Sequence, residues 1–93
     1  MTVEWSAAAL ADLDRFAEFL HDRHPRLAAI VAREILAKAR ILEVSPELGY
    51  PLSEDGRYRQ IVLEVLRAKY VFRYRVAADR IVMMRVFHGR ERR

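Results

Sequence analysis

The end of the chain alternates between two kinds of side chain, and this pattern constrains the fold more than any other feature. Between residues 69 and 88, two runs change character at every second position. In the first run, one set of positions holds Tyr70, Phe72, Tyr74 and Val76, and the positions between them hold Val71, Arg73 and Arg75. In the second run, one set holds Val82, Met84 and Val86, and the other holds Ile81, Met83, Arg85 and Phe87. A period of two is typical of strands that bury one face. The sequence therefore predicts a β-hairpin with an aromatic face on the core, an arginine face outward, and a basic tail.

Two earlier stretches carry apolar residues at helical spacing. Ser6 is a suitable N-cap for a helix over residues 7–22, whose apolar residues recur every three or four positions. Pro25 suits the first turn of a second helix over residues 25–43. Each helix has one apolar face that it cannot bury by itself, so we expect a helical hairpin packed on a sheet. Val3 and Trp5 suggest a short strand before it.

A loop and a third strand connect the helices to the closing hairpin. The segment 45–56 holds Pro46, Gly49, Pro51 and an Asp-Gly turn signal, and residues 59–65 alternate again before a turn at 66–69. The order predicts an α+β, two-layer fold: an N-terminal strand and a helical hairpin packed on one face of a small antiparallel β-sheet (βααβββ). At 93 residues, we expect one domain over residues 1–93.

The other face of this sheet is expected to be open and to attract a partner. Its residues would mix arginines with apolar groups: Gln60, Val62, Glu64, Val71, Arg73, Arg75, Ile81, Met83, Arg85 and Phe87. The charge distribution supports this, because residues 1–56 hold six basic and ten acidic side chains whereas residues 57–93 hold eleven and three. Such polarity predicts a basic surface for an anionic partner, either nucleic acid or an acidic protein segment. The alternative is a solvated sheet face whose arginines serve solubility.

Composition excludes several kinds of site and favours one compartment. The chain has no cysteine, so it has no disulfide and no thiolate metal site. It shows no phosphate loop, no nucleophile elbow and no metal-ligand spacing, and we expect no metal and no cofactor. No apolar run reaches the roughly 20 residues of a membrane span. The N-terminus lacks the basic region of a signal peptide, so we expect a cytoplasmic protein.

His88 is the one candidate for proton transfer. It ends the last expected strand and lies among Arg85, Arg90, Arg92 and Arg93 in the sequence. Nearby arginines disfavour a charged imidazole, so His88 could accept a proton while arginines stabilise a phosphate, as in a metal-free ribonuclease. No general acid accompanies it, and the alternative is a hydrogen-bonded residue that closes the sheet. The aromatic residues at 70, 72 and 74 could stack on bases, but their alternation favours the core.

At this point the chain resembles a known family. The residues that carry the resemblance are Val3-Glu4-Trp5-Ser6, Ala9-x-x-Asp12-Leu13, Leu42-x-x-Ser45-Pro46-x-Leu48-Gly49, the strand led by Arg59, the run Tyr70-Val71-Phe72-Arg73-Tyr74-Arg75-Val76, and Val86-Phe87-His88-Gly89-Arg90. In this order and spacing they resemble the ParE/RelE superfamily of type II toxin–antitoxin toxins over nearly the whole chain.

The resemblance implies a partner and a biological role. It implies an acidic antitoxin, ParD-like or similar, encoded beside the toxin, a hetero-oligomer of the two, and a role in plasmid stabilization. We expect the antitoxin to bind the helical hairpin and the arginine face, at Leu13, Phe16, Leu20, Arg73, Arg85 and Phe87.

The family divides by target, and the resemblance favours one branch. RelE-like members cleave mRNA on the ribosome with two strand lysines, a strand arginine, an arginine after the last strand and a later tyrosine. Here Arg90 matches, but Gln60, Val62 and Val71 replace the strand residues and no tyrosine follows. ParE-like members instead poison DNA gyrase without catalysis. We therefore expect a ParE-like toxin.

The expected target surface of this ParE-like toxin comprises Arg73, Arg75, Arg85, His88 and Arg90. Two alternatives stay open. One is a ribosome-dependent mRNA endoribonuclease that uses His88 and Arg90. The other is an inactive relative that only binds its partner.

Overall fold

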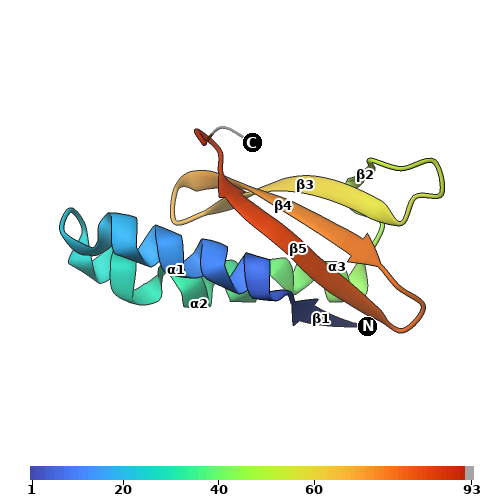
Figure 1. Cartoon of the computed structure of the whole chain (residues 1–93), viewed down its shortest axis with the longest axis horizontal. Coiled ribbons are helices and arrows are strands. Elements are labelled where there is room, and N and C mark those ends of the chain that lie inside the picture. Colours follow the sequence, from blue (N-terminus) through green and yellow to red (C-terminus); the bar gives the residue numbers. More distant parts are fainter. Residues whose placement is uncertain (92–93) are drawn as a thin grey trace.

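The computed structural model describes residues 1–91 and places a layer of helices against one face of a five-stranded sheet (Figure 1). This confirms the α+β fold with its helices early and its long strands late. The elements are β1 (Thr2–Trp5), α1 (Ala7–His21), α2 (Pro25–Ala39), α3 (Ile41–Val44), β2 (Tyr50–Pro51), β3 (Tyr58–Val65), β4 (Ala68–Val76) and β5 (Arg80–His88).

One detail of the helices differs from expectation. Ser6 caps α1 as predicted, because its Oγ accepts the Ala9 amide at 3.1 Å. The second helix is not continuous to residue 43: α2 ends at Ala39, and α3 begins after Arg40. This break turns Glu43 toward the first strand, where its carboxylate accepts the Val3 amide at 3.1 Å.

The sheet is mixed, because its first strand runs parallel to its last. The strand order is β1-β5-β4-β3-β2, and β1 pairs in parallel with β5 from Thr2 opposite Arg80 to Trp5 opposite Met83. The remaining pairs are antiparallel, as predicted. Each strand's alternation indicates which face it buries but not its neighbour's direction, so the parallel pair had no local sequence signal.

The second strand of the closing hairpin contains a β-bulge, and here the predicted face assignment was wrong. Tyr74 pairs with Met83 while Arg73 pairs with Arg85, so Met84 is the extra residue. The bulge shifts the alternation, and Ile81 and Met83 therefore face the helices and are fully buried. Only the residues after the bulge, including Arg85 and Phe87, follow the predicted faces.

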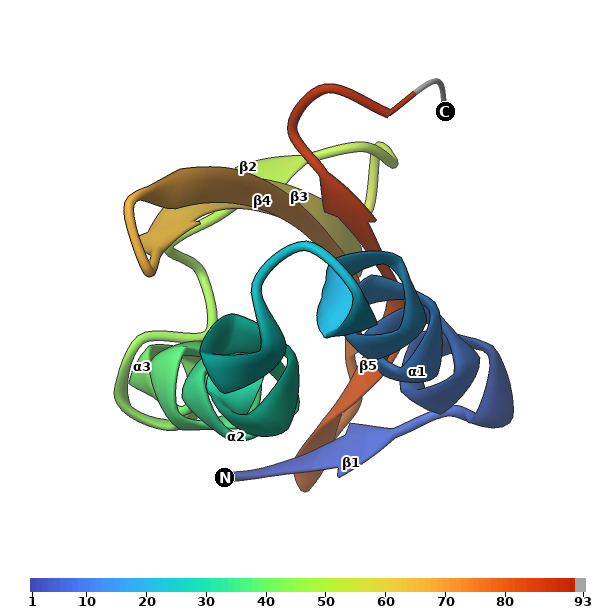
Figure 2. The same ribbon diagram turned by 90° about the vertical axis from the view of Figure 1, so that its left-hand side faces the viewer.

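Helices α1 and α2 cover one face of the sheet and enclose the core (Figure 2). The predicted aromatic face of β4 is confirmed as core, since Tyr70, Phe72 and Tyr74 are each at most 4 % exposed. They pack with buried residues of both helices and of β5: Ala9, Leu13, Phe16, Val31, Ile35, Ala39, Leu42, Val65, Ile81, Met83 and Val86. Burial of these side chains is the main favourable contribution to folding.

The long loop before β3 is fixed by two side chains from the sheet. The hydroxyl of Tyr74 accepts the Gly49 amide at 2.9 Å and donates to the Pro46 carbonyl at 2.8 Å. The Arg59 guanidinium donates to the carbonyls of Gly49, at 2.7 Å, and Gly56, at 2.8 Å. These bonds satisfy backbone groups of the loop.

Candidate functional site: an arginine face and an apolar groove

The open face of the sheet carries a cluster that we call the arginine face: Arg73, Arg75, Arg85 and Phe87. Arg73 and Arg85 are direct neighbours across the β4–β5 pair. Their guanidinium carbons lie 5.1 Å and 4.8 Å from the centre of the Phe87 ring, which is a cation–π arrangement. Phe87 is itself buried, so the two arginines cover an apolar ring that would otherwise face solvent.

Hydrogen bonds hold both central arginines of this face in place. The Nε of Arg73 donates to the Gln60 carbonyl oxygen at 2.7 Å, and the Gln60 amide donates to the Tyr50 hydroxyl at 2.6 Å. Arg85 turns to the edge of β5 and forms an ion pair with Asp12 of α1 at 2.9 Å. The arginine face is therefore oriented before any partner arrives.

Asp12 is a buried carboxylate that the helical pattern did not identify as inward-facing. It is 2 % exposed and accepts hydrogen bonds from Arg85, Arg15 and the Val86 amide. Burial by itself would raise the pKa of Asp12, but the bonds from Arg85, Val86 and Arg15 outweigh that effect and hold its pKa below the usual value. Asp12 is therefore ionised near neutral pH.

His88 lies on the opposite side of the sheet from the arginine face. Its ring meets Tyr70 edge-to-face, 5.3 Å between centres, and Tyr70 meets Phe16 in the same way at 5.2 Å. The His88 Nδ1 accepts the Arg90 amide at 3.2 Å. Arg85 points to Asp12 of α1, while Arg92 and Arg93 lie outside the described residues. Of the arginines expected around His88, the structure places Arg90 beside it.

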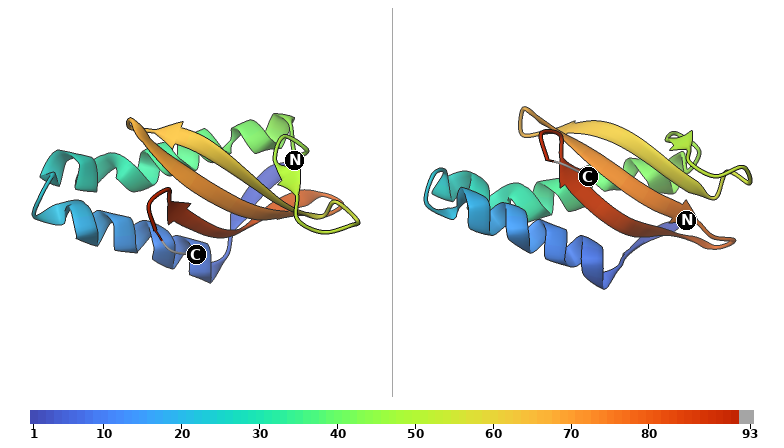
Figure 3. Two further views of the ribbon diagram at one scale, coloured as in Figure 1. Left: turned by 90° about the horizontal axis from the view of Figure 1, so that it is seen from above. Right: turned by 45° about the horizontal axis from the view of Figure 1, so that its top comes forward.

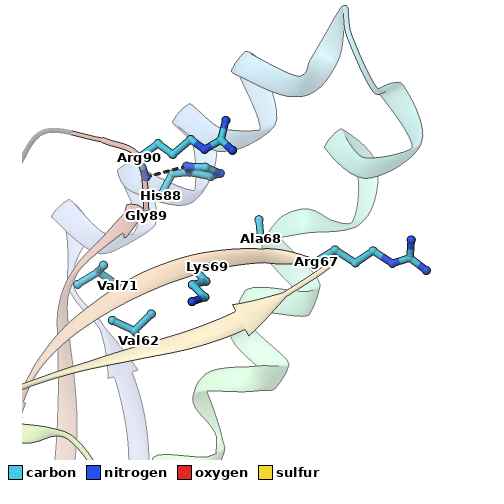
Figure 4. Close-up of a pocket in the computed structure, with 8 residues that line it drawn as sticks. All are labelled: Val62, Arg67, Ala68, Lys69, Val71, His88, Gly89 and Arg90. Carbon is cyan, nitrogen blue, oxygen red and sulfur yellow. Dashed lines mark hydrogen bonds between the residues drawn. The ribbon is translucent and has the colours of Figure 1, made fainter.

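A cavity of about 470 Å³ lies at the end of the sheet next to His88 (Figure 4). Its lining combines basic and apolar residues: Val62, Arg67, Ala68, Lys69, Val71, His88, Gly89 and Arg90. Gly89 fits closely against β4, since its amide donates to the Lys69 carbonyl at 2.7 Å and a Cβ there would meet that oxygen at 2.8 Å. Sequence reasoning missed Arg67 and Lys69, which the tight β3–β4 turn brings to this cavity.

A second hollow, which we call the apolar groove, has a volume of about 590 Å³. It lies where the α1–α2 end of the helical hairpin projects past the sheet (Figure 3). Its apolar lining includes Phe16, Phe19, Leu20, Leu27, Leu66 and Tyr70, and its rim includes Arg15, Arg23, His24, Arg90 and Glu91. Phe19 is 61 % exposed, so a large aromatic ring stands open to solvent here.

The residues expected to bind a partner therefore separate into three places. Arg73, Arg75, Arg85 and Phe87 share the arginine face, whereas His88 and Arg90 line both hollows at one end of the sheet. Phe16 and Leu20 line the apolar groove, but Leu13 is 3 % exposed and packs in the core. Leu13 therefore presents almost no surface to a partner in this conformation. Phe19 is an exposed apolar residue of α1 at this groove.

Neither a metal site nor a membrane-spanning helix is visible in the part of the chain that the structure describes. Across residues 1–91, no three His, Asp or Glu side chains are grouped so as to hold a metal ion. None of the helices in that range is long and apolar enough to cross a bilayer.

Comparison with known proteins defines the family. The model of the ParE toxin family, toxins of the parDE type II toxin–antitoxin system, matches residues 3–93. The chain therefore belongs to the ParE/RelE superfamily and is a type II toxin–antitoxin toxin.

Two similar proteins carry the RelE name. The chain is 32 % identical over 92 residues to the toxin RelE3 of Caulobacter vibrioides, covering 99 % of this chain and 98 % of the relative. It is 30 % identical to the toxin RelE1 of the same organism, covering 99 % and 97 %.

Solved structures have the same fold. A chain of the chromosomal ParDE toxin–antitoxin system from P. aeruginosa aligns with a TM-score of 0.73 at 23 % identity over 95 % of both chains. A chain of the RelBE2 toxin–antitoxin complex from Mycobacterium tuberculosis aligns with a TM-score of 0.52 at 27 % identity over 94 % of this chain and 95 % of that one.

Proposed function

We propose that this toxin acts in the cytoplasm as a ParE-like poison of DNA gyrase, with no catalysis of its own. The observation that carries the proposal is the arginine face, in which two arginines are held against a buried phenylalanine by bonds to Gln60 and Asp12. Arginines and aromatic residues dominate the binding energy of protein–protein interfaces when they are rigid and centrally placed. An oriented surface of this kind is better suited to binding a protein target than to catalysing a reaction.

The cavity beside His88 also favours binding over catalysis. Val62 and Val71 line it at the positions nearest those where, by resemblance, RelE-like members carry a lysine and an arginine. Valines cannot neutralise the charge that develops on a scissile phosphate. This supports the ParE-like branch independently of the tail.

The decisive experiment is a supercoiling assay with purified toxin and DNA gyrase. We expect inhibition together with trapped, cleaved DNA. Arg75→Ala should weaken inhibition about tenfold, the usual cost of removing an interface arginine, without affecting the fold, because no hydrogen bond or ion pair of Arg75 is seen among the described residues. Arg33→Ala, an exposed arginine on α2, is the matched control and should inhibit like the wild type.

Salt provides a second measure of the same interaction. Because exposed charges are screened beyond about 8 Å at physiological ionic strength, inhibition by the wild type should weaken as salt is raised. Inhibition by Arg75→Ala should depend less steeply on salt. If inhibition by the two proteins depended equally on salt, the proposal that the arginine face binds gyrase would be contradicted.

The second candidate is a ribosome-dependent mRNA endoribonuclease. It is favoured by one observation, namely that Arg67, Lys69, His88 and Arg90 line a single cavity. Induction without antitoxin separates the two: gyrase poisoning predicts filamentation and a DNA-damage response, whereas nuclease action predicts rapid translational arrest with in-frame mRNA cuts that His88→Ala abolishes. Unimpaired growth with ample soluble toxin would contradict both and indicate an inactive, partner-binding relative.

We further propose that an acidic antitoxin binds the apolar groove and the arginine face. The solved structures that resemble this fold come from toxin–antitoxin systems, and the groove joins an exposed apolar lining to a rim with several basic side chains. Phe19→Ala should therefore weaken binding of the acidic protein encoded in the neighbouring reading frame by about tenfold, measured by calorimetry. Leu10→Ala, which is similarly exposed on α1 but does not line the groove, should bind normally.

A further inference from the structure

One buried charge in the molecule is not explained by packing. Among the acidic side chains of residues 1–91, Asp12 is the buried one, and it lies on the inward side of α1 with Ala9, Leu13 and Phe16. Removing a carboxylate from water is costly even when it is paired, and a well-packed apolar side chain is often more stable at such a position. The charge at position 12 therefore suggests a role beyond stability.

Two chains of hydrogen bonds leave this carboxylate in different directions. In the first, Arg85 donates to both oxygens, Nε to Oδ2 at 2.9 Å and Nη2 to Oδ1 at 3.0 Å. In the second, Arg15 donates to Oδ1 at 2.7 Å and also to Glu91 at 2.7 Å. Glu91 in turn accepts the His88 amide at 2.8 Å. The first chain leads to the arginine face, and the second to the C-terminal turn that carries His88 and Arg90.

The arginine face needs such a counter-charge. Arg73 and Arg85 stand directly opposite each other on neighbouring strands, a like-charge pair that is unfavourable. Arg85 lies beyond the part of β5 that pairs with β1, and its side chain is 44 % exposed. Two hydrogen bonds to Asp12 fix the plane of the Arg85 guanidinium, whereas a single hydrogen bond would let that plane rotate.

We propose that Asp12 is a positioning residue, which orients Arg85 for the target and, through Arg15 and Glu91, holds the C-terminal turn in place. The role of Arg85 at the target rests on the proposed function. The orientation itself is a property of the free toxin and is tested without any target.

The first experiment is nuclear magnetic resonance of the free toxin, with the Arg85 Nε–H signal assigned by its loss in Arg85→Lys. In the wild type this proton should be protected from exchange with solvent by its bond to Asp12. Asp12→Asn should speed its exchange at least tenfold, and Glu91→Gln should shift the His88 amide signal while leaving Arg85 unchanged. Asp14→Asn, an exposed acid on the same helix, is the control and should alter neither signal. Unchanged exchange in Asp12→Asn would overturn the proposal.

The second experiment asks whether Asp12 acts through Arg85. Asp12→Asn and Arg85→Ala should each reduce gyrase inhibition, and the double variant should be no worse than Arg85→Ala, because the second change removes a contact already lost. Additive losses would contradict a positioning role. If Asp12→Asn does not fold, the Arg85→Lys variant is tested in its place. This variant keeps the positive charge but cannot form the bidentate contact of a guanidinium with Asp12, and full gyrase inhibition by it would overturn the proposal. If the wild type does not inhibit gyrase, the proposed function fails, whereas the exchange measurement still decides the positioning role.

Discussion

At the scale of single residues, the hydroxyl of Tyr74 contributes to stability separately from its aromatic ring. The side chain is 1 % exposed, and its Oη bonds both the Gly49 amide and the Pro46 carbonyl. Tyr74→Phe keeps the ring but removes the partner of the buried Gly49 amide and of the Pro46 carbonyl, so we expect the free energy of unfolding to fall by about 1–3 kcal/mol. Urea denaturation would measure this. Tyr58→Phe, whose side chain is 44 % exposed, should change the stability little.

The ionisation of Asp12 should appear in the pH dependence of stability. Its pKa in the folded protein is lowered from the ordinary 3.8, because the bonds from Arg85, Val86 and Arg15 outweigh the cost of burial. A lowered folded-state pKa contributes stability that is complete above the unfolded-state value and is lost as the pH falls through the folded-state value.

We therefore expect the free energies of unfolding of wild type and Asp12→Asn to differ most near pH 7 and to converge as the pH falls below about 4. Denaturant titrations at several pH values would measure the difference. A gap that stays constant down to acid pH would show that the carboxylate charge is not the source of the stability.

Asp12 also shows where sequence reasoning about single residues ends. Helical spacing described the apolar stripe of α1 but left Asp12 largely off it, because an acid is normally solvated. Its partner Arg85 is 73 positions away in the chain, and no local pattern reports such a contact. The core role of Tyr70, Phe72 and Tyr74 was predictable, since an alternating run directs its members to one face.

At the scale of elements, the β3–β4 turn is built from unfavourable residues. Leu66 and Arg67 both have positive φ, 51° and 65°, as in a type I′ hairpin turn, which normally takes Asn and Gly. A side chain in this region costs about 1 kcal/mol relative to glycine, so Arg67→Gly should stabilise the fold by about that amount in thermal unfolding. Gly56 also has positive φ, 72°, and Gly56→Ala should shift the midpoint in the opposite direction.

The element order was predictable from the sequence, but the register of β5 was not. Residues 81–84 are all apolar, so this run fits either face of the sheet, and the alternation changes phase within it. In the structure, a bulge changes the face to which these residues point. Ser6 holds the bulge in place, because its amide donates to the Met83 carbonyl and its Oγ donates to the Met84 carbonyl, each at 3.0 Å. A contact between the two ends of the chain thus decides which residues of β5 reach the core.

At the scale of the whole molecule, the predicted asymmetry of charge corresponds to separate surfaces. The basic C-terminal part supplies the strands of the arginine face, and the acidic N-terminal part supplies the helices that cover the other side (Figure 1). The sequence could predict that a basic sheet face existed. It could not predict the position of Arg90, because the tail turns toward α1 through the Arg15–Glu91 pair.

The two ends of the chain are joined in one sheet, which leads to a prediction for cooperative unfolding. Trp5, the single tryptophan, lies on β1 and packs against the core, while β1 is held by β5 and by the bond from Val3 to Glu43. If residues 1–93 form one domain, as we propose, β1 cannot leave without exposing the core under α1 and β5. Trp5 fluorescence and far-ultraviolet circular dichroism, which reports the helices, should therefore give coincident denaturation curves. A fluorescence transition at lower denaturant would show that β1 detaches first. The rest of the fold would then be stable without the parallel pairing of β1 with β5.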